Sequence, residues 1–318
     1  FKNFQRPVVC RFATLELTRG EWRKYNYSLL SPGEYIPDDG QNQTQFDIAT
    51  VSLEENGSKQ PIPYVMPPGI ERETNWGSTN MQKLNEQSMS FKVCNLVDGD
   101  ARAAYKTTEF DFRQFKKLKM FVHAEKSIRS QNLKAGDLTI LMRIGSDFTN
   151  NYYEYEIPLN FTEWGTPSTN ADAIWPTANE FDIELERLVQ VKYDRLVAMR
   201  DHGVEVTNST PYVEYDGKNK ITVVGSPTIS DVRAIMIGVR NPKKNTQSIN
   251  DDGQPKCAEI WVDELRLSDF NKEGGWAANA RIAVELADLG RVQVTGGYVS
   301  SGFGTLEQKQ TQRTMEST

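Results

Sequence analysis

A pair of closely spaced carboxylates is the first feature whose residue types could support chemistry. Glu154 and Glu156 lie two residues apart in the sequence YYEYEI, so on a β-strand both side chains point to one face. Two carboxyl groups at a suitable separation can act as acid and as nucleophile or base in glycoside hydrolysis. Alternation with Tyr153, Tyr155 and Ile157 is equally typical of a solvated strand face, and we favour that interpretation.

The two histidines do not form a catalytic or metal-binding group by their spacing. His123 alternates with apolar neighbours in MFVHAE, which predicts a satisfied strand residue, and His202 precedes a glycine, which predicts a loop or turn. Neither has a Cys, Ser or second His at ligand spacing, and the GxSxG, HExxH and P-loop motifs are missing. We therefore predict no enzyme activity, no catalytic residue, no cofactor and no metal site.

Two tryptophans could instead offer aromatic faces to a ligand. Trp164 and Trp175, together with Tyr152 and Tyr153, could line a sugar-binding groove of a β-sandwich. Aromatic side chains at strand edges more often pack in a core or under a lid. Trp164 and Trp175 are thus the candidate ligand platform of an alternative function, a carbohydrate-binding module of a surface protein.

The composition suits a polar-surfaced protein with one large or two ordinary domains. The chain has 318 residues, 38% of them hydrophobic and 25% charged, and a formal net charge of −6. No apolar run approaches the ~18 residues of a spanning helix, a test that membrane β-strands escape because their signal is alternation. The charge gives no reason to expect a nucleic-acid partner, and Lys116, Lys117 and Lys119 are predicted to form a solvated rim.

The three cysteines do not reveal a redox compartment. Cys10, Cys94 and Cys257 are widely separated and odd in number, so they predict neither a disulfide framework nor a metal site. The chain starts at Phe1 without a visible targeting signal, and we interpret it as a fragment of a longer protein.

Composition along the chain predicts four segments. Strand candidates at 8–25 and 46–55 are too few to close a core of their own. The segments are 1–60, strands from the end of a preceding unit or a flap; 61–78, a Pro-rich linker or covering loop; 79–270, the main domain; and 271–318, a β-hairpin that is predicted to start the barrel strands, and a polar tail.

The main domain is predicted to be mainly β, an antiparallel jelly-roll-like β-sandwich with one or two short helices. Short β-branched or aromatic runs separated by Gly, Asn, Asp and Pro favour such a fold. The strand candidates are 88–96, 119–125, 137–146, 152–159, 220–225, 233–241 and 258–270. Two segments favour helix: 111–118, and 179–196, where Phe181, Leu185, Leu188 and Val191 share one face.

Residues 274–299 alternate between apolar and polar side chains on both sides of a short turn. One face carries Trp276, Ala278, Ala280, Ile282, Val284 and Leu286, and the other carries Ala277, Asn279, Arg281, Ala283 and Glu285. The return strand places Val292, Val294 and Tyr298 against Gln293 and Thr295, with a weaker pattern. Such alternation is typical of an ordinary sandwich hairpin and equally of outer-membrane barrel strands of ~10 residues, whose polar side chains face the lumen.

Several long strings resemble one family. IPYVMPPGIERETNWGSTNMQKLNEQS, LVDGDARAAYKT, DFRQFKKLKMFVHAE and WVDELRLSDFNKEGGWAANAR are similar to the SprA/Sov family, the very large outer-membrane proteins of the type IX secretion system of Bacteroidetes. The resemblance extends over nearly the whole chain. Separately, AEIWVDELRLS after RAIMIGVRN resembles the last strands of jelly-roll, carbohydrate-binding-type sandwiches, which is a likeness of fold alone.

The family resemblance implies a protein-conducting outer-membrane barrel that serves secretion and, in gliding species, motility. It implies a non-enzymatic domain that shields or gates the barrel or docks partners. The implied partners are a PorV-like small barrel, a periplasmic plug protein and secreted cargo with C-terminal secretion domains. It also favours the membrane interpretation of residues 276–303.

A membrane hairpin would fix the side of the membrane on which the main domain lies. The turn ADLGR is short, and short turns of such barrels face the periplasm. Trp276 and Phe303 would then lie at the outer membrane interface, and the main domain would be extracellular.

Overall fold

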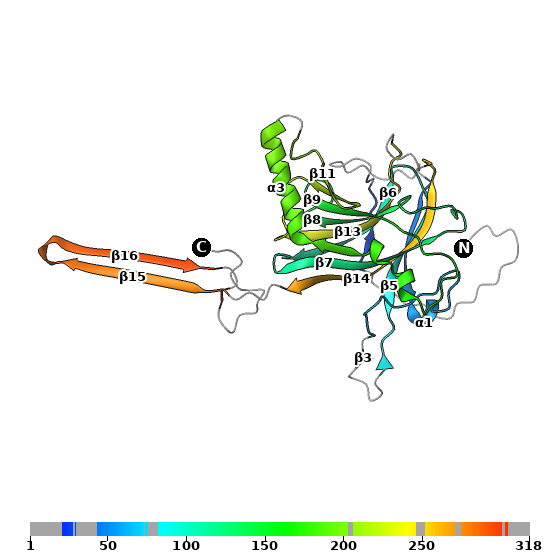
Figure 1. The fold of residues 1–318 in the computed structure, drawn as a ribbon, viewed down its shortest axis with the longest axis horizontal. Helices are drawn as coiled ribbons and strands as arrows, with labels where there is room; N and C mark the ends of the chain where they lie inside the picture. Colours follow the sequence, from blue (N-terminus) through cyan, green and yellow to red (C-terminus); the bar gives the residue numbers. More distant parts are fainter. Residues whose placement is uncertain are drawn as a thin grey trace.

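The computed structural model describes residues 21–27, 29, 43–72, 74–75, 82–202, 206–245, 252–270, 275–300 and 303–304. Two antiparallel sheets pack face to face, and we call this unit the two-sheet body (Figure 1). A β-hairpin projects from it toward the left of the view. The predicted mainly-β class with antiparallel sheets and few helices is confirmed.

The first sheet has seven strands in the order β1–β6–β13–β8–β9–β12–β11. All its neighbouring pairs are antiparallel. The strands are β1 (Arg23–Lys24), β6 (Ala101–Phe110), β8 (Thr139–Gly145), β9 (Tyr152–Pro158), β11 (Tyr212–Asp216), β12 (Asn219–Val224) and β13 (Val232–Arg240). The strand candidates at 137–146, 152–159, 220–225 and 233–241 are confirmed here, whereas the sequence analysis missed β6 and β11.

The second sheet has five strands in the order β10–β7–β14–β5–β2. They are β2 (Gln45–Ser52), β5 (Gln87–Leu96), β7 (Phe115–Lys126), β10 (Phe181–Glu184) and β14 (Lys256–Phe270). The candidates at 46–55, 88–96, 119–125 and 258–270 are confirmed by β2, β5, β7 and β14. A short pair, β3 (Thr74–Asn75) and β4 (Gln82–Lys83), stands apart from both sheets.

The strands before residue 60 are part of the two-sheet body. β2 pairs with β5 along its whole length, from Gln45 opposite Cys94 to Ser52 opposite Gln87. The described part of the predicted first segment therefore contributes an edge strand to each sheet, β1 to the first and β2 to the second, while most of candidate 8–25 lies outside the described residues. The division into four segments stays a prediction.

Strand alternation builds the main core between the two sheets. On β14, Ala258, Ile260 and Val262 point inward and are at most 4% exposed. On the facing sheet, Tyr153 and Tyr155 of β9 point inward and are equally buried. Because successive strand residues point to opposite faces, the other positions of each strand line the outer faces of the body.

The outer face of the second sheet is covered by the proline-rich segment and by the chain that follows β9. Ile62 and Tyr64 are fully buried against Trp175 and Trp261. The Trp175 indole donates a hydrogen bond to the Val65 carbonyl at 2.8 Å. Of the two alternatives for 61–78, its described residues therefore form a covering loop.

In the part of the chain that the structure describes, the helices are short except for one. They are α1 (Leu53–Asn56), α2 (Ala171–Ile174), α3 (Leu185–His202) and the 3-10 turns η1 (Thr177–Asn179) and η3 (Ala287–Leu289). Among the residues that the structure describes, no helix has both the length and the hydrophobicity to span a membrane.

Both helical predictions need correction. Residues 111–118 form a turn and the start of β7, because that stretch pairs with β10 and β14. The helix predicted at 179–196 begins only at Leu185, since Phe181 and Ile183 are buried while Asp182 and Glu184 are exposed, a period of two that continues the sheet. α3 then extends to His202, which the sequence analysis had placed in a loop or turn.

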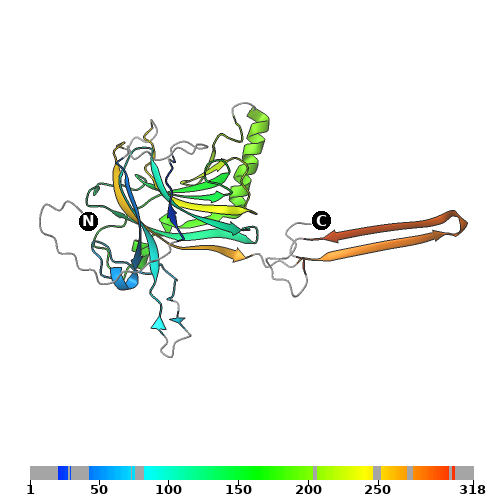
Figure 2. The same ribbon diagram turned by 180° about the vertical axis from the view of Figure 1, so that it is seen from behind.

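α3 lies across the ends of several strands of the first sheet (Figures 1 and 2). Its Lys192 donates to the Pro227 carbonyl at 2.8 Å, and Arg195 donates to the Gly225 carbonyl. Gly225 has φ +69°, and a Cβ there would lie 1.8 Å from the Asn150 carbonyl oxygen. Only glycine fits this close approach, which sets the loop against the helix.

One disulfide corrects the prediction from cysteine spacing. Cys94 on β5 and Cys257 on β14 are bonded across neighbouring strands, at a sequence separation of 163 and with a Cα–Cα distance of 4.0 Å. Two of the three cysteines are thus paired. Cys10 lies outside the described residues.

We predict that Trp175 supports the body whereas Trp164 does not. Trp175→Ala should lower the free energy of unfolding by about 3–5 kcal/mol, because it removes a buried side chain that is 2% exposed. Trp164→Ala is the matched control, since its 40% exposed ring should cost less than about 1 kcal/mol. Urea denaturation followed by circular dichroism measures both; equal losses would contradict the covering role.

Candidate functional site

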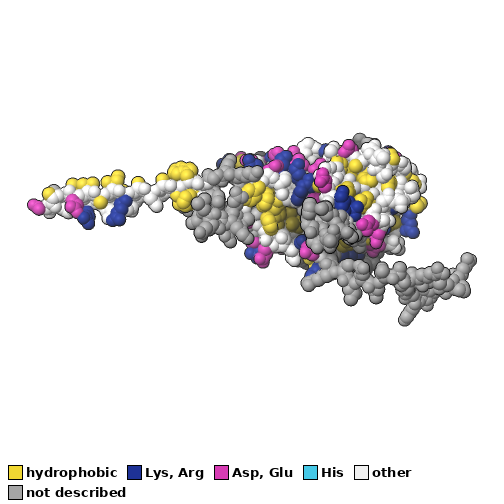
Figure 3. All heavy atoms as spheres, turned by 90° about the horizontal axis from the view of Figure 1, so that it is seen from below, with side chains coloured by type: hydrophobic (Ala, Val, Ile, Leu, Met, Phe, Trp, Pro, Cys, Tyr) yellow, Lys and Arg dark blue, Asp and Glu magenta, His cyan; other side chains and the backbone are white. Residues whose placement is uncertain are grey.

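The projecting hairpin is the most unusual surface of the chain. β15 (Ala277–Leu286) pairs with β16 (Gly290–Val299) in continuous register, with Ile282 opposite Val294 and Val284 opposite Val292. These side chains form one apolar row on one face. Figure 3 shows hydrophobic side chains along one edge of the hairpin and charged ones along the other. The predicted hairpin and its two-faced alternation are confirmed.

The opposite row is polar and internally paired. Arg281 donates to the Gln293 side-chain oxygen at 2.9 Å, and Arg291 forms an ion pair with Glu285. Cross-strand pairs of this kind stabilise a two-stranded ribbon only modestly. The polar row is consistent with a surface that faces water.

The apolar row has no cover within the described chain. Ile282 is 61% exposed, Val294 59% and Val292 49%. A two-stranded hairpin alone is marginally stable in water, because it buries too little apolar surface. The row therefore requires a lipid or protein environment that the described chain does not supply.

Both predicted interface aromatics lie at the open end of the hairpin. Trp276 is 59% exposed and contacts Tyr298 across the strands, with ring centroids 4.8 Å apart. Its carbonyl accepts from the Ser300 amide at 2.9 Å. Phe303 follows shortly after and is 40% exposed. Trp276 and Tyr298 form an aromatic pair on the apolar face; the sequence analysis had not identified Tyr298 as an interface residue.

The two tryptophans of the candidate platform are in different environments. Trp175 is buried against Tyr64, Trp261 and His123, so it cannot present its face to a ligand. Trp164 is partly exposed and donates from its indole to the Lys126 carbonyl at 3.3 Å. The prediction that Trp175 forms part of a ligand platform is therefore wrong. Trp164, by contrast, lines a pocket.

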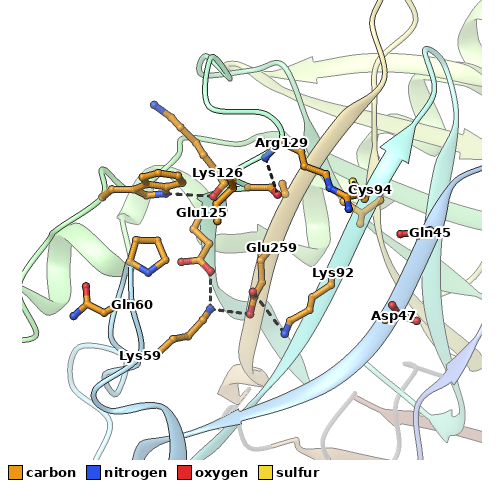
Figure 4. A pocket seen from close by; sticks show the side chains of 16 residues that line it. Gln45, Asp47, Lys59, Gln60, Lys92, Cys94, Glu125, Lys126, Arg129 and Glu259 are labelled. Atoms are coloured by element: carbon orange, nitrogen blue, oxygen red, sulfur yellow. Dashed lines mark hydrogen bonds and ion pairs between the residues drawn. The ribbon is translucent and has the colours of Figure 1, made fainter. Parts of the chain in front are cut away.

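We call that cavity, lined among others by Lys59, Lys92, Glu125, Trp164 and Glu259, the Trp164 pocket. Its volume is about 370 Å³. It lies on the outer face of the second sheet, where side chains of β2, β5, β7 and β14 converge with those of the covering loop (Figure 4). Cationic and anionic groups face each other across its floor.

Lys59 organises the charges of the Trp164 pocket. Its ammonium group lies 2.6 Å from Glu125 and 3.0 Å from Glu259, and 4.7 Å from the centre of the Trp261 ring (Figure 4). Burial raises the pKa of Glu125 to about 7, against the opposing effect of the Lys59 charge. Burial would also raise the pKa of Glu259, but hydrogen bonding from Trp261 and the charge of Lys59 lower it. One carboxylate thus holds a proton more readily than its neighbour.

The closely spaced carboxylates lie on the outer face of the first sheet but are buried. Glu154 and Glu156 are 3% and 5% exposed, so the predicted solvated face is wrong. Arg143 lies 2.5 Å from Glu154, and Arg240 pairs with both carboxylates. Burial alone would raise the pKa of Glu154, but Arg143 and Arg240 outweigh it and hold that pKa below its usual value.

This network is suited to holding strands rather than to proton transfer. A general acid needs a raised pKa, whereas Glu154 is held ionised by two guanidinium groups. The cations come from β8 and β13, so the ion pairs connect β9 with its neighbour and with the next strand. These positions therefore do not favour the glycosidase interpretation.

Among the side chains that the structure describes, His123 belongs to no catalytic or metal-binding group. His123 is fully buried, its Nδ1 lies 2.7 Å from the Ile174 carbonyl oxygen, and it stacks on Trp261 with ring centroids 4.0 Å apart. Burial lowers its pKa to about 3, which keeps the ring neutral. The predicted buried strand position is confirmed, but the prediction of a fully satisfied side chain is wrong, because Nε2 is buried without a hydrogen-bond partner. The side chain of His202 lies outside the described part of the chain.

Glu86, Asp263 and Glu264 are the described acidic residues that cluster closely enough for a metal ion. Asp263 accepts hydrogen bonds from Ser88 at 2.8 Å and from Tyr64 at 3.3 Å. Those bonds attach the covering loop to the sheet and occupy the carboxylate. We assign this group a structural role.

The chain can also be compared with known proteins. No curated protein matches it. The SprA_N family, described as "Motility related/secretion protein", matches residues 1–318, which is the entire sequence. This match confirms the resemblance that the sequence strings indicated, and the chain belongs to the SprA_N family of motility-related and secretion proteins.

Proposed function

We propose that this chain is a non-enzymatic structural and interaction domain of an outer-membrane protein-secretion translocon. The system would be type IX secretion, with gliding motility in gliding species. The family's description as a motility-related and secretion protein supports this role. The observation that carries the proposal is the hairpin, whose apolar row is exposed along its length while its polar row pairs internally.

The hairpin has the dimensions of membrane strands. β15 and β16 have ten residues each, and a tilted transmembrane strand needs about 9–11. The apolar row would face lipid and the polar row the lumen of a β-barrel completed by strands outside this chain. Trp276, Tyr298 and Phe303 at the open end would lie at the membrane interface, as aromatic girdles do.

The body would act beside the barrel. In this proposal it is a jelly-roll-like β-sandwich that shields or gates the barrel, or docks a PorV-like small barrel, a periplasmic plug or cargo with a C-terminal secretion domain. The many buried ion pairs within the body support a scaffold more than a catalyst.

The body would be extracellular. The hairpin turn at Ala287–Leu289 is short, as periplasmic turns of such barrels are, which leaves the body on the opposite side. The disulfide between Cys94 and Cys257 supports an oxidising compartment, because disulfides are rare in the cytosol.

A second candidate function is carbohydrate binding in the Trp164 pocket. One partly exposed indole stands beside donors such as Lys59 and Lys92 and acceptors such as Glu125 and Glu259. Sugar hydroxyls can donate and accept at once, so a mixed polar floor beside an aromatic ring suits them.

The proposed membrane hairpin predicts different effects from neighbouring substitutions. Ile282→Arg places a charge on the apolar row, at a cost of about 2–4 kcal/mol if that position faces the bilayer midplane. Ala283→Arg is the matched control, because Ala283 faces Gln293 on the polar row. We expect the first variant of the full-length protein to be depleted from outer membranes and the second to remain. Equal membrane content of both variants would contradict the proposal.

The proposed sidedness predicts opposite labelling of two cysteines in the full-length protein. With Cys10 replaced by serine, Asp201→Cys should react with an impermeant maleimide on intact cells, because Asp201 is exposed on the body. Asp288→Cys, in the hairpin turn, should react only after the outer membrane is permeabilised. The reverse pattern would place the body in the periplasm.

The second candidate function predicts that glycan binding depends on Trp164. If the pocket binds sugar, a glycan array should detect a ligand whose binding falls at least about tenfold in Trp164→Ala, the loss of about 1.4 kcal/mol. Trp276→Ala, on the hairpin, should leave that binding unchanged. An array without any bound glycan at millimolar concentration would remove this candidate.

A further inference from the structure

Strand register places the start of α3 and the exit to the hairpin at one end of the second sheet. Ser268 of β14 lies opposite Lys117 of β7, which in turn lies opposite Glu184 of β10. The next residue along the chain, Leu185, begins α3. Two residues beyond Ser268, Phe270 ends β14 opposite Phe115. We call this end of the body the hairpin end.

The hairpin cannot move far from that end. Five residue steps separate Phe270 from Gly275, where the described chain resumes before β15. Because an extended chain spans at most ~3.6 Å per residue, the base of the hairpin lies within roughly 18 Å of Phe270. A membrane that receives the hairpin therefore comes close to the hairpin end of the body.

α3 has two apolar faces, of which the body buries one. Leu185, Leu188 and Val191 are at most 2% exposed and pack in the main core. On the outer face, Val189 is 42%, Tyr193 59% and Leu196 49% exposed. Their spacing of four and three residues aligns them in one stripe along the helix. A single exposed apolar side chain is ordinary, whereas an aligned stripe indicates a contact surface.

Aromatic side chains extend the apolar surface at the same end. Phe110 is 47% exposed and lies 6.2 Å from Phe115, whose ring lies 5.2 Å from Phe270. The amide of Phe112 donates to the Ile229 carbonyl at 2.8 Å, in the loop whose Pro227 carbonyl accepts from α3. The loop at 227–229 thus contacts both α3 and the segment that follows Phe110.

The direction of α3 also suits contact with a membrane that the hairpin enters. In Figures 1 and 2, α3 runs crosswise to the hairpin and lies at the side of the body from which the hairpin projects. If the hairpin enters a membrane, a crosswise helix at this position runs along the membrane surface. Tyrosine suits that boundary, because its ring is apolar and its hydroxyl group stays hydrated.

We propose that the hairpin end of the body rests on a lipid surface, with Val189, Tyr193 and Leu196 of α3 and the ring of Phe110 in the region between headgroups and acyl chains. This inference rests on the proposed membrane hairpin. The hairpin supplies the main attachment, and the helix stripe adds a second contact that limits tilting of the body. The occupant is lipid because the short tether brings the bilayer to this end.

Three labelling positions test the proposal in the full-length protein reconstituted into phosphatidylcholine–phosphatidylglycerol vesicles. Its unpaired cysteines are replaced by serine and Cys94–Cys257 is kept. A nitroxide is attached at Tyr193→Cys on α3, at Val284→Cys on the apolar row, and at Ile128→Cys. Ile128 is the matched control, a 79% exposed apolar residue just beyond Lys126, at the end of β7 opposite to Phe115. Collision rates with oxygen, which concentrates in lipid, and with a neutral nickel chelate, which stays in water, give each label's environment.

We expect the ratio of oxygen to nickel collisions to be raised at positions 193 and 284 relative to position 128. A raised ratio at 284 with a water-like ratio at 193 overturns the lipid contact of α3 and leaves the proposed function standing. Protection of 193 from both reagents also overturns it, since that result indicates a protein partner. Water-like ratios at both 193 and 284 overturn the membrane hairpin itself.

Discussion

Burial of the first half of β14 on both of its faces is the constraint on which the rest of the structure depends. Ile260 points into the core between the sheets and Trp261 into the cluster under the covering loop, and both are fully buried. A strand buried on both faces has one register, because a shift by one residue would exchange the two sets of side chains. The same strand ends at Phe270, so the position of the hairpin end follows from this packing.

Much of the fold could be predicted from local pattern, and the failures have physical causes. Most strands of both sheets were recognised because their alternation or β-branched runs are intrinsic to the segments. The sequence predicts a helix over residues 181–184 because Phe181 lies four positions before Leu185. That spacing fits a helix and fits equally a strand that runs into a helix. Burial of Phe181 and Ile183 beside β7, a contact between distant segments, decides for the sheet. β6 was missed because ARAAYKTTEF lacks a strong β-branched run, although its neighbours bury its first half.

The candidate sites also differ in whether local sequence pattern predicts them. The hairpin could be predicted because the alternation that defines its two faces lies within two neighbouring strands of ten residues each, which pair with each other. The Trp164 pocket could not, because its walls come from strands and loops between Gln45 and Glu259 that meet only in the folded body. Trp164 and Trp175 have the same chemistry, and only the covering loop buries one and leaves the other partly exposed. The disulfide joins residues whose separation gives no signal of proximity.

The contrast between paired charged side chains and exposed apolar side chains indicates where this chain contacts other molecules. Buried carboxylates are costly unless they are paired, and here Glu154 is neutralised by Arg143 and Arg240, and Glu125 and Glu259 share Lys59. The charges of Glu154, Arg143 and Arg240 are used in holding strands together, so they offer little to a partner. The apolar side chains of the hairpin and of the outer face of α3 are in the opposite situation, because the described chain gives them no cover. Removing that surface from water is favourable, at roughly 25 cal/mol per Å². The strongest remaining drive for association therefore comes from apolar surface at the hairpin and the hairpin end, rather than from the charged outer faces of the sheets.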